Sequence, residues 1–146
     1  MILLLDIGNT HTHLGLANSR RVVKQANLPT TKLLDDTAWP LVQRFVGQTR
    51  LDGACLCSVV PRATPEAKRL LSQPPLELTP ATVVGVGIDY PKPETIGPDR
   101  LANAVAAKHH FGAPVVVVDF GTAVTFDVVD RRGNYCGGII APGLAA

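Results

Sequence analysis

Two short segments combine an acidic residue, a glycine and hydroxyl or amide side chains directly after an apolar run. Asp6-Ile7-Gly8-Asn9-Thr10 follows residues 2–5, and Asp119-Phe120-Gly121-Thr122 follows residues 115–118. Glycine lets a ligand approach the backbone, Asn and Thr can hydrogen-bond phosphate oxygens, and an Asp beside phosphate is suited to holding a cation. Ordinary strand exits favour the same residues, so one such turn says little. Two at corresponding positions favour a pair of phosphate-binding loops.

A third segment, Gly97-Pro98-Asp99-Arg100, stands at the start of a helix predicted over residues 99–111. Pro suits the first helical turn, where the helix N-terminus also keeps an acid ionised. Such a carboxylate can accept the proton of a substrate hydroxyl during phosphoryl transfer, and a guanidinium suits a carboxylate or phosphate. The alternative interpretation is a helix start with a surface arginine.

A fourth segment, Gly137-Gly138-Ile139-Ile140-Ala141-Pro142-Gly143, has glycines at the start of an apolar run and Pro-Gly at its end. This pattern predicts a strand whose backbone is closely approached by another group. A plain hairpin followed by a turn is an equally good interpretation.

Apolar periodicity predicts the elements that must position these residues. In the first part of the chain we expect strands at 2–7, 11–17, 21–28, 53–59 and 76–79, and helices at 33–46, 64–71 and 99–111. Pro40 falls inside the first helix, which can therefore begin late. Residues 80–98 are rich in Gly and Pro and predict a long loop, a kind of segment that is often functional. Three sequential strands followed by helix-separated strands are typical of a ribonuclease-H-like unit.

Three further strands, predicted at 115–119, 122–129 and 135–140, repeat the opening of the chain. We therefore expect an α/β fold in which a ribonuclease-H-like (actin-like ATPase) domain with a mixed sheet spans residues 1–112. The first strands of a second, similar domain follow over residues 113–146 and stop short of its helices. Asp6, Asp99 and Asp119 are expected to meet in one cleft.

Composition excludes several other classes of protein. With 46% hydrophobic and 18% charged residues, the chain can bury a core and is not mainly disordered. No apolar run approaches the ~20 residues of a membrane span, and the N-terminus lacks the basic region of a signal peptide. The basic residues are not clustered with aromatics, so we expect neither nucleic acid nor membrane as a partner. The three cysteines lack the spacing of a disulfide framework or a zinc site, so we expect buried, reduced thiols. We also expect a cytoplasmic protein.

The ordered motifs resemble those of type III pantothenate kinase, a family of the actin-like ATPase, sugar kinase and Hsp70 superfamily. The resemblance covers essentially the whole chain. It rests on Asp6-Ile7-Gly8-Asn9-Thr10 with Gly15, Gly97-Pro98-Asp99-Arg100, Asp119-Phe120-Gly121-Thr122-Ala123-Val124-Thr125 and Gly137-Gly138-x-Ile140-x-Pro142-Gly143.

The resemblance implies a transferase with an alcohol group as acceptor. Such a kinase phosphorylates pantothenate with ATP to give 4'-phosphopantothenate, the first step of coenzyme A biosynthesis. It further implies a homodimer that uses Mg²⁺ or a similar divalent cation together with K⁺ or NH₄⁺. Because the family's chains run on well beyond the matched length, we expect an N-terminal portion with weak or no activity alone.

The resemblance also implies roles for individual residues. Contacts to ATP are expected from Asp6, Ile7, Gly8, Asn9, Thr10, His11, Thr12, His13 and Thr122. Contacts to pantothenate are expected from Tyr90, Gly97, Pro98, Asp99 and Arg100, with Asp99 as the catalytic base. Asp119 would hold the monovalent cation, and Asp6 the divalent cation, directly or through water.

Two alternatives stay open within the same superfamily. One is a non-catalytic transcriptional accessory factor of the same family, and the other is a different small-molecule kinase. The presence of Asp6, Asp99, Arg100 and Asp119 favours the enzyme, since a regulator without catalytic constraint could lose any of them.

Overall fold

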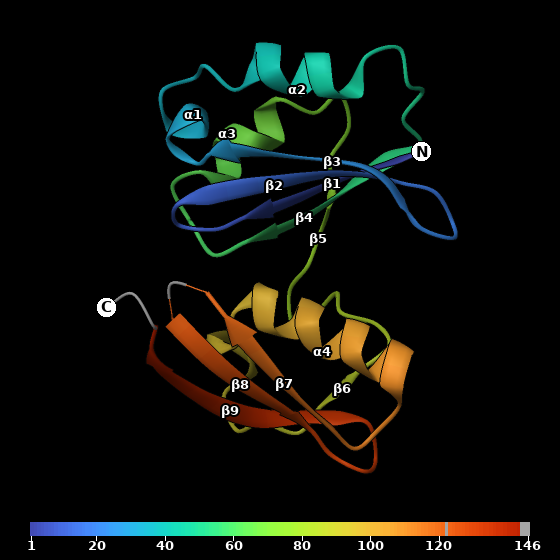
Figure 1. The fold of residues 1–146 in the computed structure, drawn as a ribbon, viewed down its shortest axis with the longest axis vertical. Coiled ribbons are helices and arrows are strands. Elements are labelled where there is room, and N and C mark those ends of the chain that lie inside the picture. The colour runs from blue at the N-terminus through green and yellow to red at the C-terminus, as the bar shows by residue number, and fades with distance from the viewer. Residues whose placement is uncertain (122, 144–146) are drawn as a thin grey trace. The chain divides into compact units, whose positions relative to one another are not determined.

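A computed structural model describes residues 1–121 and 123–143. The described residues form two compact units, which divide between Leu78 and Thr79. Figure 1 shows a sheet with accompanying helices in each unit. Each unit also has its own cluster of buried hydrophobic side chains. The units divide after residue 78, whereas the sequence places a domain boundary after residue 112.

The first unit is a five-stranded mixed sheet with the order β3-β2-β1-β4-β5. Its strands are β1 (Ile2–Ile7), β2 (His11–Ala17), β3 (Val22–Pro29), β4 (Gly53–Ser58) and β5 (Leu76–Glu77). Its helices are α1 (Thr31–Leu34), α2 (Trp39–Val46) and α3 (Thr64–Arg69). The first three strands pair antiparallel, and β4 and β5 are parallel additions. This is the sheet predicted for a ribonuclease-H-like unit.

The core of the first unit lies on one face of this sheet. Leu3, Leu5 and Ile7 alternate along β1 and are buried, whereas Ile2 and Asp6 are exposed and Leu4 is half-buried. Since successive strand residues point to opposite faces, the apolar set faces a single layer. Figure 1 shows α1, α2 and α3 on the same side of the sheet, where they cover that layer.

The helix predicted over residues 33–46 is two helices, α1 and α2, separated by residues 35–38. Asp36 adopts φ 59°, the left-handed region that Asp tolerates better than most residues. Asp35 Oδ1 accepts the backbone N–H of Thr37 at 3.1 Å, which stabilises the break. Pro40 lies in the first turn of α2, as its position predicts.

The second unit is a four-stranded sheet with the order β6-β9-β8-β7. Its elements are β6 (Gly87–Ile88), the 3₁₀ helix η1 (Pro93–Thr95), α4 (Pro98–Phe111), β7 (Val115–Phe120), β8 (Ala123–Val129) and β9 (Asn134–Pro142). Within the segment expected to be a loop, β6 pairs parallel with β9. Leu101 and Ala104 of α4 pack with Val129 and Tyr135. This shared core explains why α4 groups with the later strands.

The β7–β8–β9 meander repeats the β1–β2–β3 meander. In each, a glycine follows the first strand and donates its N–H back across the turn, from Gly8 to the His11 carbonyl and from Gly121 to the Ala123 carbonyl, both at 2.9 Å. Asp6 and Asp119 occupy the penultimate positions of β1 and β7. The duplication predicted from the two Asp-x-Gly segments is therefore confirmed. Thr122 lies outside the described residues.

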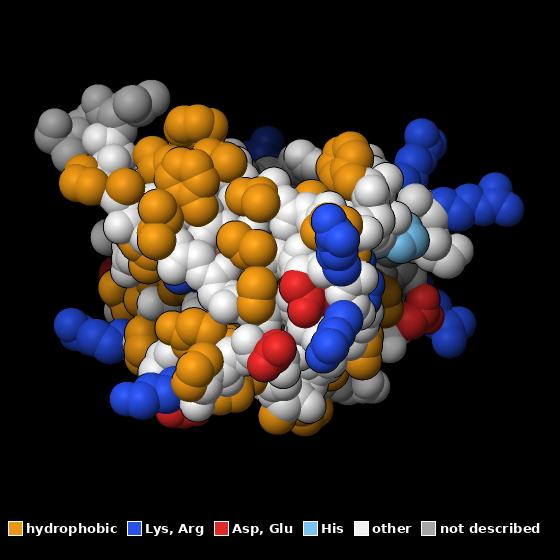
Figure 2. Space-filling view, turned by 90° about the horizontal axis from the view of Figure 1, so that it is seen from below, with side chains coloured by type: hydrophobic (Ala, Val, Ile, Leu, Met, Phe, Trp, Pro, Cys, Tyr) orange, Lys and Arg blue, Asp and Glu red, His pale blue; other side chains and the backbone are white. Residues whose placement is uncertain are grey.

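One face of the second sheet carries exposed apolar side chains. Val116, Val118 and Phe120 of β7 and Ile139 of β9 are exposed, and Figure 2 shows hydrophobic side chains gathered on the molecular surface seen from below. Cys136 of β9 is also exposed, which corrects the expectation of buried thiols. Cys57 is buried and Cys55 half-buried. Over residues 1–121 and 123–143, no helix combines the length and apolar character needed to cross a membrane.

We expect Leu56→Ala to lower the free energy of unfolding by about 2–5 kcal/mol, because Leu56 is fully buried in the first core and cannot be replaced without a cavity. Val23→Ala, at an exposed position of β3, is the control and should cost less than about 1 kcal/mol. Urea unfolding followed by circular dichroism measures both. Equal losses for the two variants would contradict this placement of the core.

Candidate functional site

The turn between β1 and β2 is fixed by Thr30. The Thr30 hydroxyl donates to the Gly8 carbonyl at 2.7 Å, and its backbone N–H donates to the Thr10 carbonyl at 3.0 Å. The hydroxyls of Thr12 and Thr30 lie 3.0 Å apart and both residues are buried. A Cβ at Gly8 would lie 3.1 Å from the His11 carbonyl oxygen. The first predicted phosphate loop is thus fixed by hydrogen bonds from Thr30 and by the bond from the Gly8 N–H to the His11 carbonyl.

The predicted ATP-contacting residues of this turn divide into two sets. Asp6, Asn9, Thr10, His11 and His13 are exposed. His13 Nδ1 and Asn27 Oδ1 form a hydrogen bond of 2.8 Å across to β3. By contrast, the side chains of Ile7 and Thr12 face the core, so these two residues could meet a ligand only through their backbone.

The start of α4 places Asp99 in the first helical turn, beside Gly97 in an extended conformation. Asp99 Oδ1 accepts the backbone N–H of Arg100 at 2.8 Å. A Cβ at Gly97 would lie 2.5 Å from Asp99 Oδ1, so the glycine makes room for this carboxylate. The carboxylate is half-buried and can accept a proton from an approaching hydroxyl.

Arg100 is not a surface arginine. Its Nε donates to Asp127 Oδ1 at 2.6 Å, and its Nη2 donates to the Phe126 carbonyl at 3.0 Å. The Asp127 side chain is 0% exposed and that of Arg100 is 15% exposed. The alternative interpretation of this motif, a helix start with a solvated arginine, is therefore wrong.

Tyr90 and Tyr135 lie next to this ion pair. The Tyr135 hydroxyl donates to Asp127 Oδ1 at 2.9 Å, and the ring of Tyr90 meets that of Tyr135 edge to face, with centroids 6.3 Å apart. The Asp89 N–H donates to the Tyr135 carbonyl at 2.9 Å, which sets the position of the next residue, Tyr90. Burial raises the pKa of Tyr135 well above its usual value, and the hydrogen bond to the Asp127 carboxylate adds to the increase. Tyr135 therefore remains a protonated donor.

The glycines of the fourth motif accommodate this chain's own side chains. Gly137 has φ 120°, and a Cβ there would lie 3.1 Å from Cε2 of Tyr90. A Cβ at Gly138 would overlap the Phe126 carbonyl oxygen and lie 2.6 Å from Nη2 of Arg100. The close approach predicted for this strand is thus confirmed within the second unit, and the approaching groups are Tyr90 and Arg100.

Asp119 is tied to α4 by Asn103, whose Nδ2 donates to Asp119 Oδ2 at 3.1 Å. Asn103 lies four residues after Asp99, on the same side of the helix. The structure therefore brings Asp119, Asp99 and Arg100 to one region of the second unit. Asp6 belongs to the first unit, and its meeting with the other two acids stays a prediction.

Sequence reasoning missed Thr30, Asn103, Asp127 and Tyr135. Asp127 carried a signal, since it is an acid inside an otherwise apolar strand, and such an acid needs a buried partner. Asn103 could have been found by its helical spacing from Asp99. Thr30 and Tyr135 stand in ordinary contexts, and only tertiary structure shows what they contact.

The described residues contain no group of three or more His, Cys, Asp or Glu side chains that could hold a metal ion. Magnesium bound with a nucleotide needs only one or two carboxylates in addition to the phosphates and water. The exposed Asp6 carboxylate at the end of β1 fits that requirement.

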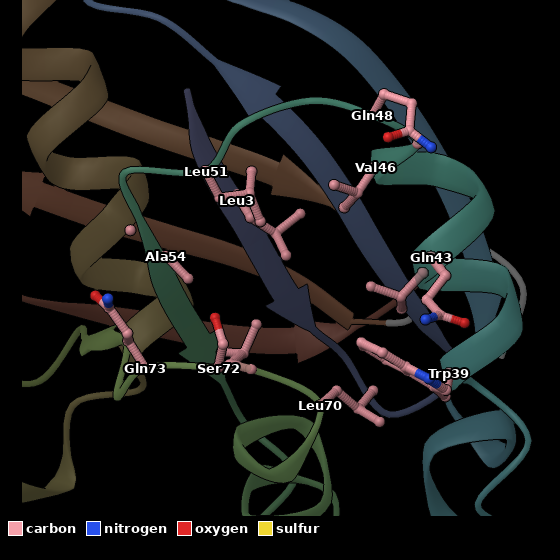
Figure 3. A pocket seen from close by; sticks show the side chains of 14 residues that line it. Leu3, Trp39, Gln43, Val46, Gln48, Leu51, Ala54, Leu70, Ser72 and Gln73 are labelled. Carbon is pink, nitrogen blue, oxygen red and sulfur yellow. The ribbon is translucent and has the colours of Figure 1, made fainter.

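A cavity of about 460 Å³ lies elsewhere in the first unit. Figure 3 shows its lining side chains, which come from α2, from the starts of β1 and β4, and from the segment after α3. Leu3 and Ala54 line it, so it opens at the amino ends of these strands, whereas Gly8 follows the carboxyl end of β1. It is not part of the candidate site.

A family model described as Type III pantothenate kinase matches residues 2–146. The chain is 44% identical over 144 residues to a type III pantothenate kinase of Akkermansia muciniphila, covering 99% of this chain and 58% of that protein. It is 40% identical over 149 residues to one from Methylacidiphilum infernorum, covering 99% of this chain and 52% of that protein. The chain thus spans little more than half the length of these curated relatives.

Two solved structures share the fold. A Campylobacter jejuni protein assigned to the Baf family of transcriptional activators matches with a TM-score of 0.62 and 22% identity, covering 98% of this chain and 55% of that chain. The Aquifex aeolicus Ppx/GppA phosphatase matches with a TM-score of 0.60 and 14% identity, covering 99% of this chain and 53% of that chain. At these identities the likeness shows the fold alone, and it confirms the predicted actin-like ATPase class.

The raised pKa of Tyr135 makes a prediction about alkaline stability. A group whose pKa is higher in the folded than in the unfolded chain contributes stability below its unfolded pKa, about 10 for Tyr, and loses it as pH rises further. We therefore expect the free energy of unfolding to fall above about pH 10, and Tyr135→Phe to reduce that fall. Urea unfolding at a series of pH values measures the slopes. Identical slopes would contradict this environment for Tyr135.

Proposed function

Because the chain belongs to the type III pantothenate kinase family, we propose that its protein transfers the γ-phosphate of ATP to pantothenate, giving 4'-phosphopantothenate for coenzyme A biosynthesis. The observation that carries this proposal is the start of α4, where a half-buried carboxylate stands beside an arginine fixed by a buried acid. Phosphoryl transfer requires mainly positioning and charge neutralisation from a protein, and this arrangement would supply the positioning of the acceptor.

Asp99 is the proposed catalytic base. Its carboxylate would accept the proton of the pantothenate hydroxyl as that oxygen attacks the γ-phosphate. Its place in the first turn of α4 is fixed by the Arg100 backbone N–H, which donates to Asp99 Oδ1 at 2.8 Å. Gly97, whose missing side chain leaves room for the carboxylate, supports the assignment.

Arg100, Tyr90, Gly97 and Pro98 are the proposed contacts to pantothenate. Pantothenate is an anion, and a guanidinium binds a carboxylate through a fixed pair of donors. The hydrogen bonds of Arg100 to Asp127 and to the Phe126 carbonyl use two of the five N–H donors of its guanidinium. The side chain of Tyr90 is exposed and its ring meets that of Tyr135 edge to face, which leaves it accessible to bound pantothenate.

The β1–β2 turn, from Asp6 to His13, is proposed to bind the ATP phosphates, with Thr122 as a further contact. Bound ATP with Mg²⁺ or a similar divalent cation would supply the γ-phosphate and neutralise its charge. The turn itself offers short side chains and closely packed backbone, held in place by Thr30. Asp6 would reach the divalent cation directly or through water.

Asp119 is proposed to hold a monovalent cation, K⁺ or NH₄⁺. Carboxylate oxygen is a suitable ligand for such an ion, and the Asn103 amide orients the Asp119 carboxylate. We also propose a cytoplasmic homodimer whose ligands are pantothenate and ATP, without nucleic acid or membrane partners. The exposed apolar face of the second sheet supports a protein contact, since such patches commonly mark interaction surfaces.

The alternatives are a non-catalytic transcriptional accessory factor of the same family and another small-molecule kinase. The buried partner of Arg100 favours an enzyme that needs a precisely placed arginine over a regulator that does not. A coupled ADP assay with pantothenate, N-acetylhexosamines and acetate separates the kinases by their acceptor.

We expect Asp99→Asn to lower kcat at least about 100-fold while ATP binding is retained, because an amide cannot accept the hydroxyl proton. The test uses the protein encoded by the complete reading frame, in a pantothenate-dependent ADP assay with nucleotide affinity measured separately. Asp36→Asn is the matched control, since Asn tolerates the left-handed conformation at this exposed site. An unchanged kcat for Asp99→Asn would overturn the assignment of the base.

We expect Asp119→Asn to raise the K⁺ concentration needed for half-maximal activity at least about tenfold, because the charged ligand is lost. Rates over a potassium chloride series at constant ionic strength provide the measurement. If the half-maximal K⁺ concentration stays where it is in the parent enzyme, Asp119 does not hold the cation.

A further inference from the structure

Asp127 is a fully buried acid that the proposed catalytic steps do not use. It lies in β8, and its side chain is 0% exposed. A single oxygen, Oδ1, accepts hydrogen bonds from both Arg100 Nε and the Tyr135 hydroxyl. Oδ2 is buried and has no hydrogen-bond partner among the described residues.

Stability alone is a poor explanation for such a carboxylate. Removing a charge from water is costly, and an apolar pair of similar size often serves a core equally well. The unsatisfied second oxygen adds to this cost. The two hydrogen bonds that Oδ1 accepts connect Asp127 to Arg100 and, through Tyr135, to Tyr90. Both Arg100 and Tyr90 are proposed contacts of pantothenate.

The first direction leads to the guanidinium of Arg100. Its Nε is fixed by Asp127 and its Nη2 by the Phe126 carbonyl of the same strand. Two separate contacts define both the position and the plane of a guanidinium. Gly138 provides the space, since any side chain there would lie against Nη2. A long side chain that would otherwise sample many rotamers is thereby restricted to one arrangement.

The second direction leads to Tyr90 through Tyr135. The Tyr135 hydroxyl is held by Asp127, and its ring supports the edge of the Tyr90 ring. Gly137 lets Tyr90 lie close against the β9 backbone. One carboxylate thus connects the two side chains that stand on α4 and on the segment after β6.

We propose that Asp127 is a positioning residue for the acceptor site, orienting the guanidinium of Arg100 directly and the ring of Tyr90 through Tyr135. This inference rests on the proposed function of the site. It assigns Asp127 no contact with the acceptor. Its loss should therefore weaken acceptor binding and leave the nucleotide's contacts intact.

The test is Asp127→Asn in the protein encoded by the complete reading frame. The amide keeps the size of the side chain and loses the charge that holds the guanidinium. We expect the KM for pantothenate to rise about 10-fold to 100-fold, the range that misplacement of a binding group by about 1 Å can produce. The KM for ATP should change less than about twofold. A general loss of folding would instead lower the fraction of active protein and leave both the KM for pantothenate and the KM for ATP unchanged.

Asp130→Asn is the matched control. It makes the same acid-to-amide change in the β8–β9 turn, where Asp130 Oδ1 accepts the N–H groups of Arg132 and Asn134. We expect both KM values to stay as in the parent. A double-mutant cycle adds Arg100→Lys, which keeps the charge but not the planar pair of donors. If Asp127 acts through Arg100, Asp127→Asn should raise the KM for pantothenate much less in the Arg100→Lys background.

Three results would overturn the inference: an unchanged KM for pantothenate in folded Asp127→Asn, equal increases for both substrates, or fully additive effects in the cycle. If Asp127→Asn fails to fold, Tyr135→Phe removes only the second contact and should still raise the KM for pantothenate selectively, about two- to fivefold. No such rise would also refute the inference. If the parent protein does not phosphorylate pantothenate, the proposed function fails first, and the positioning role fails with it.

Discussion

The buried pair of Arg100 and Asp127 is the interaction on which the organisation of the second unit depends. Placing two opposite charges inside a small core is tolerable only when both are close together and hydrogen-bonded. That requirement accounts for neighbouring features that otherwise look unrelated. A side chain at Gly138 would collide with the Phe126 carbonyl and with Arg100, and the hydroxyl of Tyr135 donates to Asp127. The motif at the start of α4 and the glycine motif of β9 therefore pack against each other, with Arg100 beside Gly138.

The two units use the same local solution for a strand that ends in an acid. In each, the glycine after the strand closes the turn through its own N–H, and the acid stands one residue before the end of the strand. The supports differ. The first turn is anchored by the hydroxyl of Thr30, the residue after β3, whereas Asp119 is oriented by an amide from α4. The repeated backbone pattern therefore has different polar partners in the two units.

Most elements could be predicted from the sequence because their signals are local. The apolar run over residues 2–5 specifies β1, and Gly97 and Pro98 mark the start of α4. The prediction failed where distant residues decide. The break between α1 and α2 depends on the left-handed Asp36, and the grouping of α4 with the later strands depends on packing of Leu101 against Val129. In the site, Asp99 and Arg100 were recognisable by their motif. The contacts of Asp127 with Arg100 depend on tertiary structure, which places β8 against α4.

The aromatic residues are divided between the units in a way that makes the molecule convenient to observe. Trp39 is the one tryptophan of the sequence and stands at the start of α2, beside the cavity of the first unit. Both tyrosines, Tyr90 and Tyr135, belong to the second unit. Indole emission therefore reports on one half of the chain and phenol absorbance on the other. A single unlabelled sample can show which half responds to a nucleotide and which to an acceptor.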